Sequence, residues 1–156
     1  MIEAAIPGEA ALILEHLALD LNGTITLDGE VVPGAAERLT ALSAQVAIHL
    51  LTADTRGQAA EIADQLGVHL VRIDRGDEPA QKRQYVERLG PGRVVAIGNG
   101  ANDCQMLEAA VLGIAVLGNE GLAVATLNAA DIVVASIRDA LDLLLTPQRL
   151  AATLRH

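Results

Sequence analysis

The stretch LEHLALDLNGT at residues 14–24 carries an apolar run that leads into an acid and a turn. Leucine and alanine fill residues 17–19, and Asp20 follows them just before Asn22 and Gly23. Apolar residues in succession are typical of a strand that is covered on both faces, as in a parallel sheet. The stretch therefore predicts a buried strand over Leu14–Leu19 with a carboxylate at its carboxyl end.

Five more short apolar runs follow, and amphipathic segments lie between them. The runs predict strands over Val46–Leu51, Val68–Ile73, Val94–Ile97, Ile114–Leu117 and Ile132–Ala135. Repeated strand–helix units indicate an α/β fold: a Rossmann-like, doubly wound, mostly parallel sheet between two helical layers, which is a three-layer α/β/α sandwich. The 156 residues contain no linker or internal repeat, so we expect residues 1–156 to form a single domain.

Helix signals lie between several of these strands. One helix carries an apolar stripe formed by Ala59, Ile62, Ala63 and Leu66. Pro33 is suited to start a second helix, and Asp77 is suited to cap a third that runs to Gly90. Thr146 and Pro147 start the last helix.

Two segments interrupt the alternation and predict small β-hairpins. Thr24–Val32 contains Asp28-Gly29, a dipeptide that suits a type I′ turn. Ile2–Ile6 and Ala11–Leu14 flank Pro7-Gly8, so they predict a second hairpin that leads into the first core strand.

The composition argues against nucleic-acid and membrane partners. The chain has a net charge of −9, which repels phosphate backbones, and Tyr85 is its one aromatic residue apart from histidine. The longest apolar stretch, Ala109–Gly118, is shorter than the ~20 residues that a membrane-spanning helix needs. The start of the chain, MIE, lacks the basic region of a signal peptide, and the lone Cys104 fits a reducing compartment. We therefore expect a cytoplasmic protein.

Polar residues follow three of the predicted strands, at the edge where an open α/β sheet binds its ligands. Asp20 ends the first strand, Thr52 follows the second, and GNGAND at residues 98–103 follows the fourth. Lys82 lies on the inward stripe of its helix, so its ammonium is expected to point toward the core or a site. The sequence thus predicts a polar site at the carboxyl edge of the sheet.

These four pieces, in this order, resemble the motifs of the haloacid dehalogenase superfamily of phosphotransferases. The family pattern is Asp-x-Asp-Gly-Thr, a strand-end Ser or Thr, a Lys, and Gly-Asp-Gly-x-Asn-Asp. The segments LNGT, TAD and GNGAND also resemble the phosphorylation domain of P-type cation pumps. Over nearly its whole length, the chain is most similar to stand-alone proteins described as soluble P-type-ATPase-like hydrolases.

The resemblance implies how the site would handle phosphate. Asp20 would be the nucleophile that forms an aspartyl-phosphate, and Lys82 would neutralise charge on Asp20 and on the phosphoryl group. Thr52 and the backbone N–H groups from Ala53 onward would bind phosphate oxygens, together with a helix N-terminus near Thr55-Arg56.

Magnesium is the cofactor that the resemblance implies. Asp20, the backbone carbonyl of Asn22 and the side chain of Asn99 would be its ligands, and Asp103 would orient metal-bound water and the loop. Asn22 stands where most phosphatases of the superfamily have an Asp general acid/base, and Asn99 stands where they have a metal-binding Asp. An amide cannot shuttle a proton, and its neutral oxygen binds Mg²⁺ more weakly than a carboxylate does, so slow hydrolysis is expected.

The intervals between the motifs are too short for the cap domains of the family. The first interval has room for the Asp28-Gly29 hairpin and one helix, and the interval from Thr52 to Lys82 for one helix and one strand. The resemblance therefore implies a site without a cap domain, and the missing nucleotide-binding domain argues against ion pumping. Relatives without caps commonly form homo-oligomers, which we expect here. Leu150 and Leu154 could join such an interface or pack on their own sheet.

Three hypotheses for the function stay open. The first is a Mg²⁺-dependent phosphohydrolase or phosphotransferase that acts through Asp20 on a small phosphorylated substrate or a phosphoprotein. The second is a catalytically impaired protein that binds phosphate and Mg²⁺ and acts through a protein partner, which Asn22 and Asn99 favour. The third is a nucleotide-binding module without phosphoryl chemistry.

Each site residue also has a structural alternative. Asp20 could belong to a simple turn, and Thr52 could cap a helix. Asp103 could favour its helix through the helix dipole, and Lys82 could extend to solvent.

Overall fold

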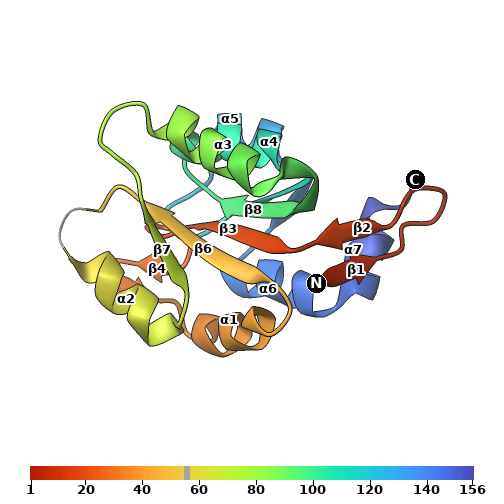
Figure 1. The fold of residues 1–156 in the computed structure, drawn as a ribbon, viewed down its shortest axis with the longest axis horizontal. Coiled ribbons are helices and arrows are strands. Elements are labelled where there is room, and N and C mark those ends of the chain that lie inside the picture. The colour runs from red at the N-terminus through yellow and green to blue at the C-terminus, as the bar shows by residue number, and fades with distance from the viewer. Residues whose placement is uncertain (55–56) are drawn as a thin grey trace.

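A six-stranded parallel sheet, with helices on both of its faces, forms the centre of the computed structural model, which describes residues 1–54 and 57–156 (Figure 1). The strand order is β10-β9-β8-β3-β6-β7. The strands are β3 (His16–Asp20), β6 (Ala47–Thr52), β7 (His69–Arg72), β8 (Val94–Gly98), β9 (Leu112–Val116) and β10 (Ile132–Val134). This order confirms the doubly wound prediction, because the chain leaves β3 toward β6 and β7 and then returns to β8 on the other side.

Most of the helices form the two outer layers of the sandwich, and the last one packs against the N-terminal strand. The helices are α1 (Ala35–Ser43), α2 (Gln58–Leu66), α3 (Glu78–Leu89), α4 (Cys104–Ala109), α5 (Val124–Ala129), α6 (Ile137–Leu145) and α7 (Pro147–Leu154), with 3₁₀ turns η1 (Pro91–Arg93) and η2 (Ala101–Asp103). In Figure 1, α3, α4 and α5 cover one face of the sheet, and α1 and α6 cover the other. No helix in the described ranges is both long and apolar enough to cross a lipid bilayer.

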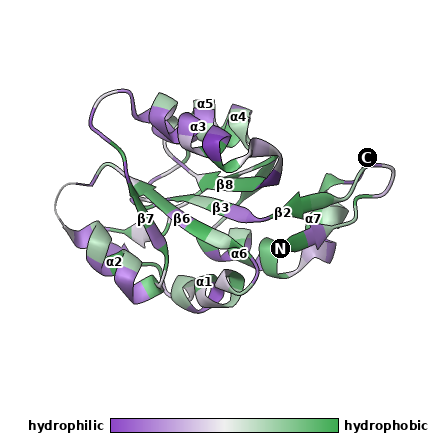
Figure 2. Ribbon diagram, viewed as in Figure 1, coloured by the Kyte–Doolittle hydropathy of each residue, from purple (hydrophilic) through white to green (hydrophobic). Residues whose placement is uncertain are grey.

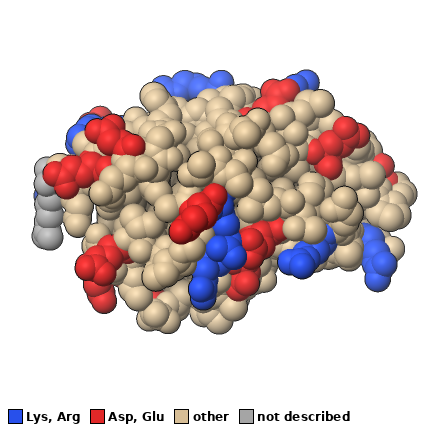
Figure 3. All heavy atoms as spheres, turned by 90° about the horizontal axis from the view of Figure 1, so that it is seen from below, with Lys and Arg blue, Asp and Glu red and all other residues tan. Residues whose placement is uncertain are grey.

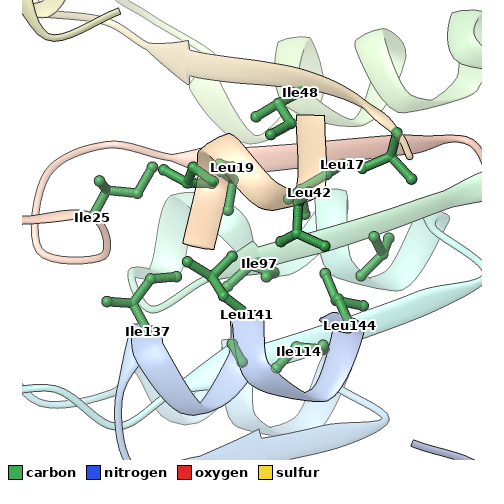
Figure 4. Close-up of a cluster of buried hydrophobic side chains, with 14 of the residues drawn as sticks. Leu17, Leu19, Ile25, Leu42, Ile48, Ile97, Ile114, Ile137, Leu141 and Leu144 are labelled. Carbon is green, nitrogen blue, oxygen red and sulfur yellow. The ribbon is translucent and has the colours of Figure 1, made fainter. Parts of the chain in front are cut away.

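Successive side chains of β3 point to opposite faces of the sheet and pack in two separate hydrophobic cores. Leu19 of β3 meets Leu42 of α1 and Leu141 of α6 in the larger core (Figure 4). Ala18 points to the opposite face and packs with Val86 of α3. Strands β6 and β8 are hydrophobic along most of their length, whereas α3 is largely hydrophilic (Figure 2). This pattern explains why the sequence showed successive apolar residues in the strands and amphipathic stripes in the helices.

Both predicted hairpins are present. Strands β4 (Thr26–Leu27) and β5 (Glu30–Val31) are antiparallel, and their turn has φ of 52° at Asp28 and 84° at Gly29, as a type I′ turn requires. Strands β1 (Ile2–Ala4) and β2 (Leu12–Leu14) form the second hairpin, and β1 packs against α7. Leu150 of α7 is fully buried there and Leu154 is half-buried, so both pack within their own chain.

The boundaries of the first core strand differ from the prediction. Leu14 belongs to hairpin strand β2, and the core strand starts at His16 and includes Asp20. At Glu15 the backbone changes partners: its N–H donates to the Arg93 carbonyl, and its carbonyl accepts from Ala47. The run from Leu14 to Leu19 therefore belongs to two sheets: Leu14 pairs with β1 in the hairpin, and the residues from His16 onward pair with β6 and β8. The hydropathy of the sequence does not mark this change of strand partners.

Charged side chains are interspersed on the face below the sheet. Figure 3 shows acidic and basic groups mixed over this face, several of them side by side, with no continuous region of one sign in that view. Arg38 of α1 and Asp142 of α6 form an ion pair of 2.7 Å, which joins the two helices that cover this face of the sheet. The net negative charge is thus not concentrated on this face.

Three histidines from neighbouring strands come together under α3. His16 Nδ1 lies 3.2 Å from His49 Nε2, and the His49 and His69 rings are 5.8 Å apart. The Tyr85 hydroxyl lies 2.9 Å from His49 Nδ1, so both ring nitrogens of His49 are hydrogen-bonded when the imidazole is neutral. Burial, and then the charges of His16 and His69, lower the pKa of His49 to about 4. The three side chains therefore pack against one another.

The neutral state of His49 makes stability depend on pH. An unfolded histidine titrates near 6.5 and folded His49 near 4, so the unfolded chain binds more protons between these values. The free energy of unfolding should therefore fall as the pH drops from about 6.5 to 4. His49→Gln should reduce this fall by about 1–2 kcal/mol in urea titrations. An unchanged profile for His49→Gln would contradict the prediction.

Gly113 of β9 lets α4 approach the sheet closely. A Cβ at this position would lie 2.9 Å from the backbone oxygen of Leu107 in α4, so the helix would have to shift. Gly113→Ala should lower the free energy of unfolding by about 1–3 kcal/mol, as overpacking does. Gly92→Ala, where a Cβ meets nothing within 4 Å, should change it by less than about 0.5 kcal/mol in the same denaturant titration. Equal effects of the two substitutions would rule out this explanation.

Candidate active site

A cleft of about 880 Å³ opens at the carboxyl edge of the sheet, where the strand order reverses between β3 and β8. The residues predicted for the site line this cleft, apart from Asp103. They are Asp20, Asn22, Thr52, Ala53, Lys82 and Asn99. The helix N-terminus expected near Thr55-Arg56 lies outside the described residues, and α2 is described from Gln58.

Lys82 is buried between two carboxylates. Its Nζ donates to Asp20 Oδ1 at 2.8 Å and to Asp103 Oδ1 at 2.7 Å. Lys82 is only 1% exposed, so the alternative in which it extends to solvent is wrong. The helix α3 carries it inward because Lys82 lies one turn before Val86, which is buried against the sheet.

The two carboxylates and one ammonium leave an excess negative charge in the site. Burial, and then the Asp103 charge, raise the pKa of Asp20 to about 7, although Lys82 opposes both effects. Burial alone would lower the pKa of Lys82, but Asp20 and Asp103 together outweigh it and raise that pKa. Lys82 therefore stays charged, and the site favours the binding of one more positive charge beside Asp20.

Asp103 holds the loop after β8 in place. Its Oδ2 accepts from the N–H groups of Asn99, at 3.0 Å, and Gly100, at 3.1 Å. A Cβ on Gly98 would lie 2.5 Å from the Asp103 carboxylate, so only glycine fits there. Asp103 is fully buried and both of its oxygens are used, which fits a role in orienting the loop and Lys82.

Thr24 brings the side chains of Asp20 and Asn99 together. Its hydroxyl lies 3.2 Å from Asp20 Oδ2 and 3.1 Å from Asn99 Oδ1. Asn99 Nδ2 faces the Gly121 carbonyl at 3.5 Å, so the amide presents its oxygen to Thr24. Thr24 was not singled out as a site residue, although it is the Thr of the segment DLNGT.

Thr52 forms a local turn at the end of β6. Its hydroxyl accepts from the Asp54 N–H at 3.1 Å, and the residue is nearly fully buried. This contact is a turn made by the side chain and not a helix cap, because the N-cap of α2 is Gly57. Thr52 and Ala53 therefore present a polar, ordered strand end to the cleft.

Other residues that line the cleft were not identified from the sequence. They are Asp54, Arg75, Glu78, Gly100, Asn102, Glu120, Gly121, Leu122 and Ala123. Asn102 donates to Glu78 at 3.0 Å, which joins η2 to the first turn of α3. Asp54, Gly100 and Asn102 lie within the TAD and GNGAND segments. No motif marks the other six positions, because the turns that bring them to the cleft are set by tertiary packing.

The donor set around Asp20 suits a hard divalent cation. Asp20 Oδ2 and Asn99 Oδ1 both lie within hydrogen-bonding distance of the Thr24 hydroxyl. The exposed Asn22 lines the same cleft. Oxygen ligands from carboxylate, amide and backbone carbonyl groups are those that Mg²⁺ prefers, so these residues fit it. No three His, Cys, Asp or Glu side chains converge as a metal site in the part of the chain that the structure describes. The residues that would bind Mg²⁺ thus supply one carboxylate, from Asp20, and neutral oxygens from Asn22 and Asn99.

The parallel sheet thus carries a buried Asp–Lys–Asp network at the point where its strand order reverses, an arrangement suited to phosphoryl transfer. A family model described as haloacid dehalogenase-like hydrolase matches residues 1–110. The chain therefore belongs to the haloacid dehalogenase-like hydrolase family, which confirms the resemblance inferred from its motifs.

Relatives include stand-alone proteins and pumps. An uncharacterized protein of Methanocaldococcus jannaschii is 46% identical over 92 aligned positions, and the match covers 54% of this chain and 99% of that protein. The copper-exporting P-type ATPase of Mycobacterium leprae is 35% identical over 156 aligned positions, and the match covers 97% of this chain but 19% of the pump. The chain thus spans only about a fifth of the pump's length.

A solved phosphatase shares the fold. The 3-deoxy-D-manno-octulosonate 8-phosphate phosphatase of Moraxella catarrhalis, solved with magnesium, phosphate and KDO, superposes with a TM-score of 0.69. Its sequence is 19% identical, and the match covers 89% of this chain and 90% of that one.

The described residues hold no inserted cap domain. Only β4 and β5 lie between β3 and α1, and only α2 and β7 lie between β6 and α3.

The buried charge on Asp20 should reduce the stability of the protein without cations. The folded chain keeps a proton on Asp20 up to a pKa of about 7, whereas the unfolded chain loses it above 3.8. The contribution of Asp20 to the free energy of unfolding is therefore greatest at acid pH, and it is lost as the pH rises through about 7. Asp20→Asn should raise the free energy of unfolding by about 1–3 kcal/mol at basic pH, and by less at acid pH.

Urea titrations in a chelating buffer, at one acid and one basic pH, measure this difference. Asp28→Asn, on the exposed hairpin turn, is the matched control and should show no such pH dependence. A variant Asp20→Asn that is less stable than wild type at basic pH would show that the ion pair with Lys82 outweighs burial.

Proposed function

We propose that the protein is a Mg²⁺-dependent phosphohydrolase or phosphotransferase that forms an aspartyl-phosphate on Asp20. The observation that carries this proposal is the 2.8 Å contact between Asp20 and Lys82 at the base of an uncapped cleft. Membership of a hydrolase family, and a fold shared with a phosphatase solved with magnesium and phosphate, support it.

Asp20 acts as the nucleophile in the proposed reaction. A carboxylate oxygen of Asp20 attacks phosphorus, the bond from phosphorus to the leaving oxygen breaks, and the leaving group takes the electron pair. Lys82 stabilises the negative charge, and Thr52 and the Ala53 N–H hold phosphoryl oxygens. Water then attacks phosphorus and releases Asp20. Mg²⁺, held by Asp20, Asn22 and Asn99, supplies charge neutralisation when it is bound.

Asn22 and Asn99, which replace acids, are expected to limit the rate of the proposed reaction. Asn22 can donate a hydrogen bond but not a proton, so the leaving group has to depart as an anion. Aryl and acyl phosphates leave readily in this form, whereas alkyl phosphates do not. Activation of water for hydrolysis also lacks a base at Asn22, so the phosphorylated state should be long-lived.

Asn22 and Asn99 also favour a second candidate function, in which phosphate is not released. A protein that is phosphorylated on Asp20, or that binds phosphate and Mg²⁺, without turnover could signal through a protein partner. The two functions share the same site and differ only in whether phosphate is released. Turnover therefore distinguishes them.

Restoring the two acids tests the proposal. Wild type should hydrolyse an aryl phosphate only in the presence of Mg²⁺, and Asp20→Ala should abolish this activity. The double variant Asn22→Asp, Asn99→Asp should hydrolyse an alkyl phosphate about 10²–10⁴-fold faster than wild type, because a general acid is restored. Asn128→Asp, at an exposed position of α5 outside the cleft, adds the same kind of charge and should have no effect.

Steady-state phosphate release, with Mg²⁺ and with a chelator, gives these rates. No detectable Mg²⁺-dependent activity in the double variant would contradict a phosphatase site. Turnover by the double variant but not by wild type would favour the second candidate function.

Further features of the function are part of the proposal. The uncapped cleft suits a small phosphorylated molecule or a phosphorylated segment of a protein. A cytoplasmic location and a homo-oligomeric state are predictions that come from the composition and from the resemblance. The pump relatives share only this domain-sized segment, so no ion transport is proposed.

A further inference from the structure

We propose that Glu120 supplies the negative charge that the cation site lacks at Asn99, a role that rests on the proposed Mg²⁺-dependent function. Glu120 lines the active-site cleft but belongs to none of the four motifs. It lies beyond β9, on a turn between Gly118 and Gly121. A cation held beside Asp20 and Asn99 would therefore have a second acidic side chain nearby.

The turn that carries Glu120 is fastened to Asn99. The Gly121 N–H donates to the Gly118 carbonyl at 3.0 Å and closes the turn. The Ala123 N–H donates to the Asn99 carbonyl at 2.9 Å, and Asn99 Nδ2 lies 3.5 Å from the Gly121 carbonyl. Two contacts with one residue thus fix the position of the turn relative to the expected cation ligand.

The Glu120 carboxylate occupies space beside Gly23. A Cβ on Gly23 would lie 2.2 Å from Glu120 Oε2 and 3.0 Å from Asn99 Nδ2. Both atoms therefore border the volume that the missing side chain of Gly23 leaves open. Gly23 directly follows Asn22, whose carbonyl is the expected backbone ligand, so the carboxylate lies at the junction of the two loops that would hold the cation.

Among the residues that the structure describes, none competes for the Glu120 carboxylate or neutralises it. Within residues 1–54 and 57–156, no hydrogen bond or ion pair forms with the Glu120 side chain, which is exposed. Asp20 is already paired with Lys82, and Asn99 is neutral. An unpaired carboxylate beside neutral oxygen ligands strengthens the binding of a divalent cation, either as a ligand or through a bound water.

Removal of the Glu120 charge should weaken cation binding. Glu120→Gln keeps the size of the side chain and should raise the Kd for Mg²⁺ by about tenfold or more. The control is Glu78→Gln, since Glu78 lines the same cleft but accepts a hydrogen bond from Asn102, and it should change the Kd less than about threefold. Asn99→Asp placed in the Glu120→Gln background should restore most of the affinity.

Calorimetric titration with Mg²⁺, and electron paramagnetic resonance with Mn²⁺, measure binding without any substrate. Equal affinities of wild type and Glu120→Gln would overturn the role of Glu120 alone. Tighter binding by Glu120→Gln would overturn it as well. Failure of the wild type to bind either cation would instead overturn the proposed Mg²⁺-dependent function and this role together.

Discussion

The Lys82 ammonium, held between two buried carboxylates, is the interaction on which the site depends. It joins β3 through Asp20 and η2 through Asp103, although these residues lie 62 and 21 positions from it in the chain. Without the lysine, two carboxylates would face each other in a buried setting, which costs several kcal/mol. The same contact orders the loop after β8, because Asp103 also binds the Asn99 and Gly100 N–H groups. Folding and the proposed chemistry thus share one ion-pair network.

The charge balance of the site connects the two amides to the proposed cation. Asp20 and Asp103 exceed Lys82 by one negative charge, and burial raises the pKa of Asp20 to about 7, so the site favours an added positive charge. With Asn22 and Asn99 in place of acids, proton transfer is lost and charge at the metal is reduced. Glu120 can restore part of that charge but not the general acid. The site is therefore better suited to accepting a phosphoryl group than to releasing it.

Local signals in the sequence predicted most of the fold and the site. Asp28-Gly29 determined the type I′ turn, and the motif order placed Asp20 and Lys82 at one edge of the sheet. The helix α6 was missed although Ser136 caps it by accepting from the Asp139 N–H. The contacts of Thr24 with Asn99, 75 residues away, and the position of Glu120 beside Gly23 could not be predicted. Register between strands and the placement of turns come from tertiary packing, which a single sequence does not reveal.

The most direct measurement is chemical trapping of the phosphorylated carboxylate. Wild type incubated with acetyl phosphate and Mg²⁺, quenched in acid and analysed by intact and tandem mass spectrometry, reports both the adduct and its position. Because Asn22 slows release, the account predicts that one phosphoryl group accumulates on Asp20, is removed by hydroxylamine and is absent without Mg²⁺. No adduct, or an adduct on another residue while Asp20→Asn is labelled equally, would contradict the central claim.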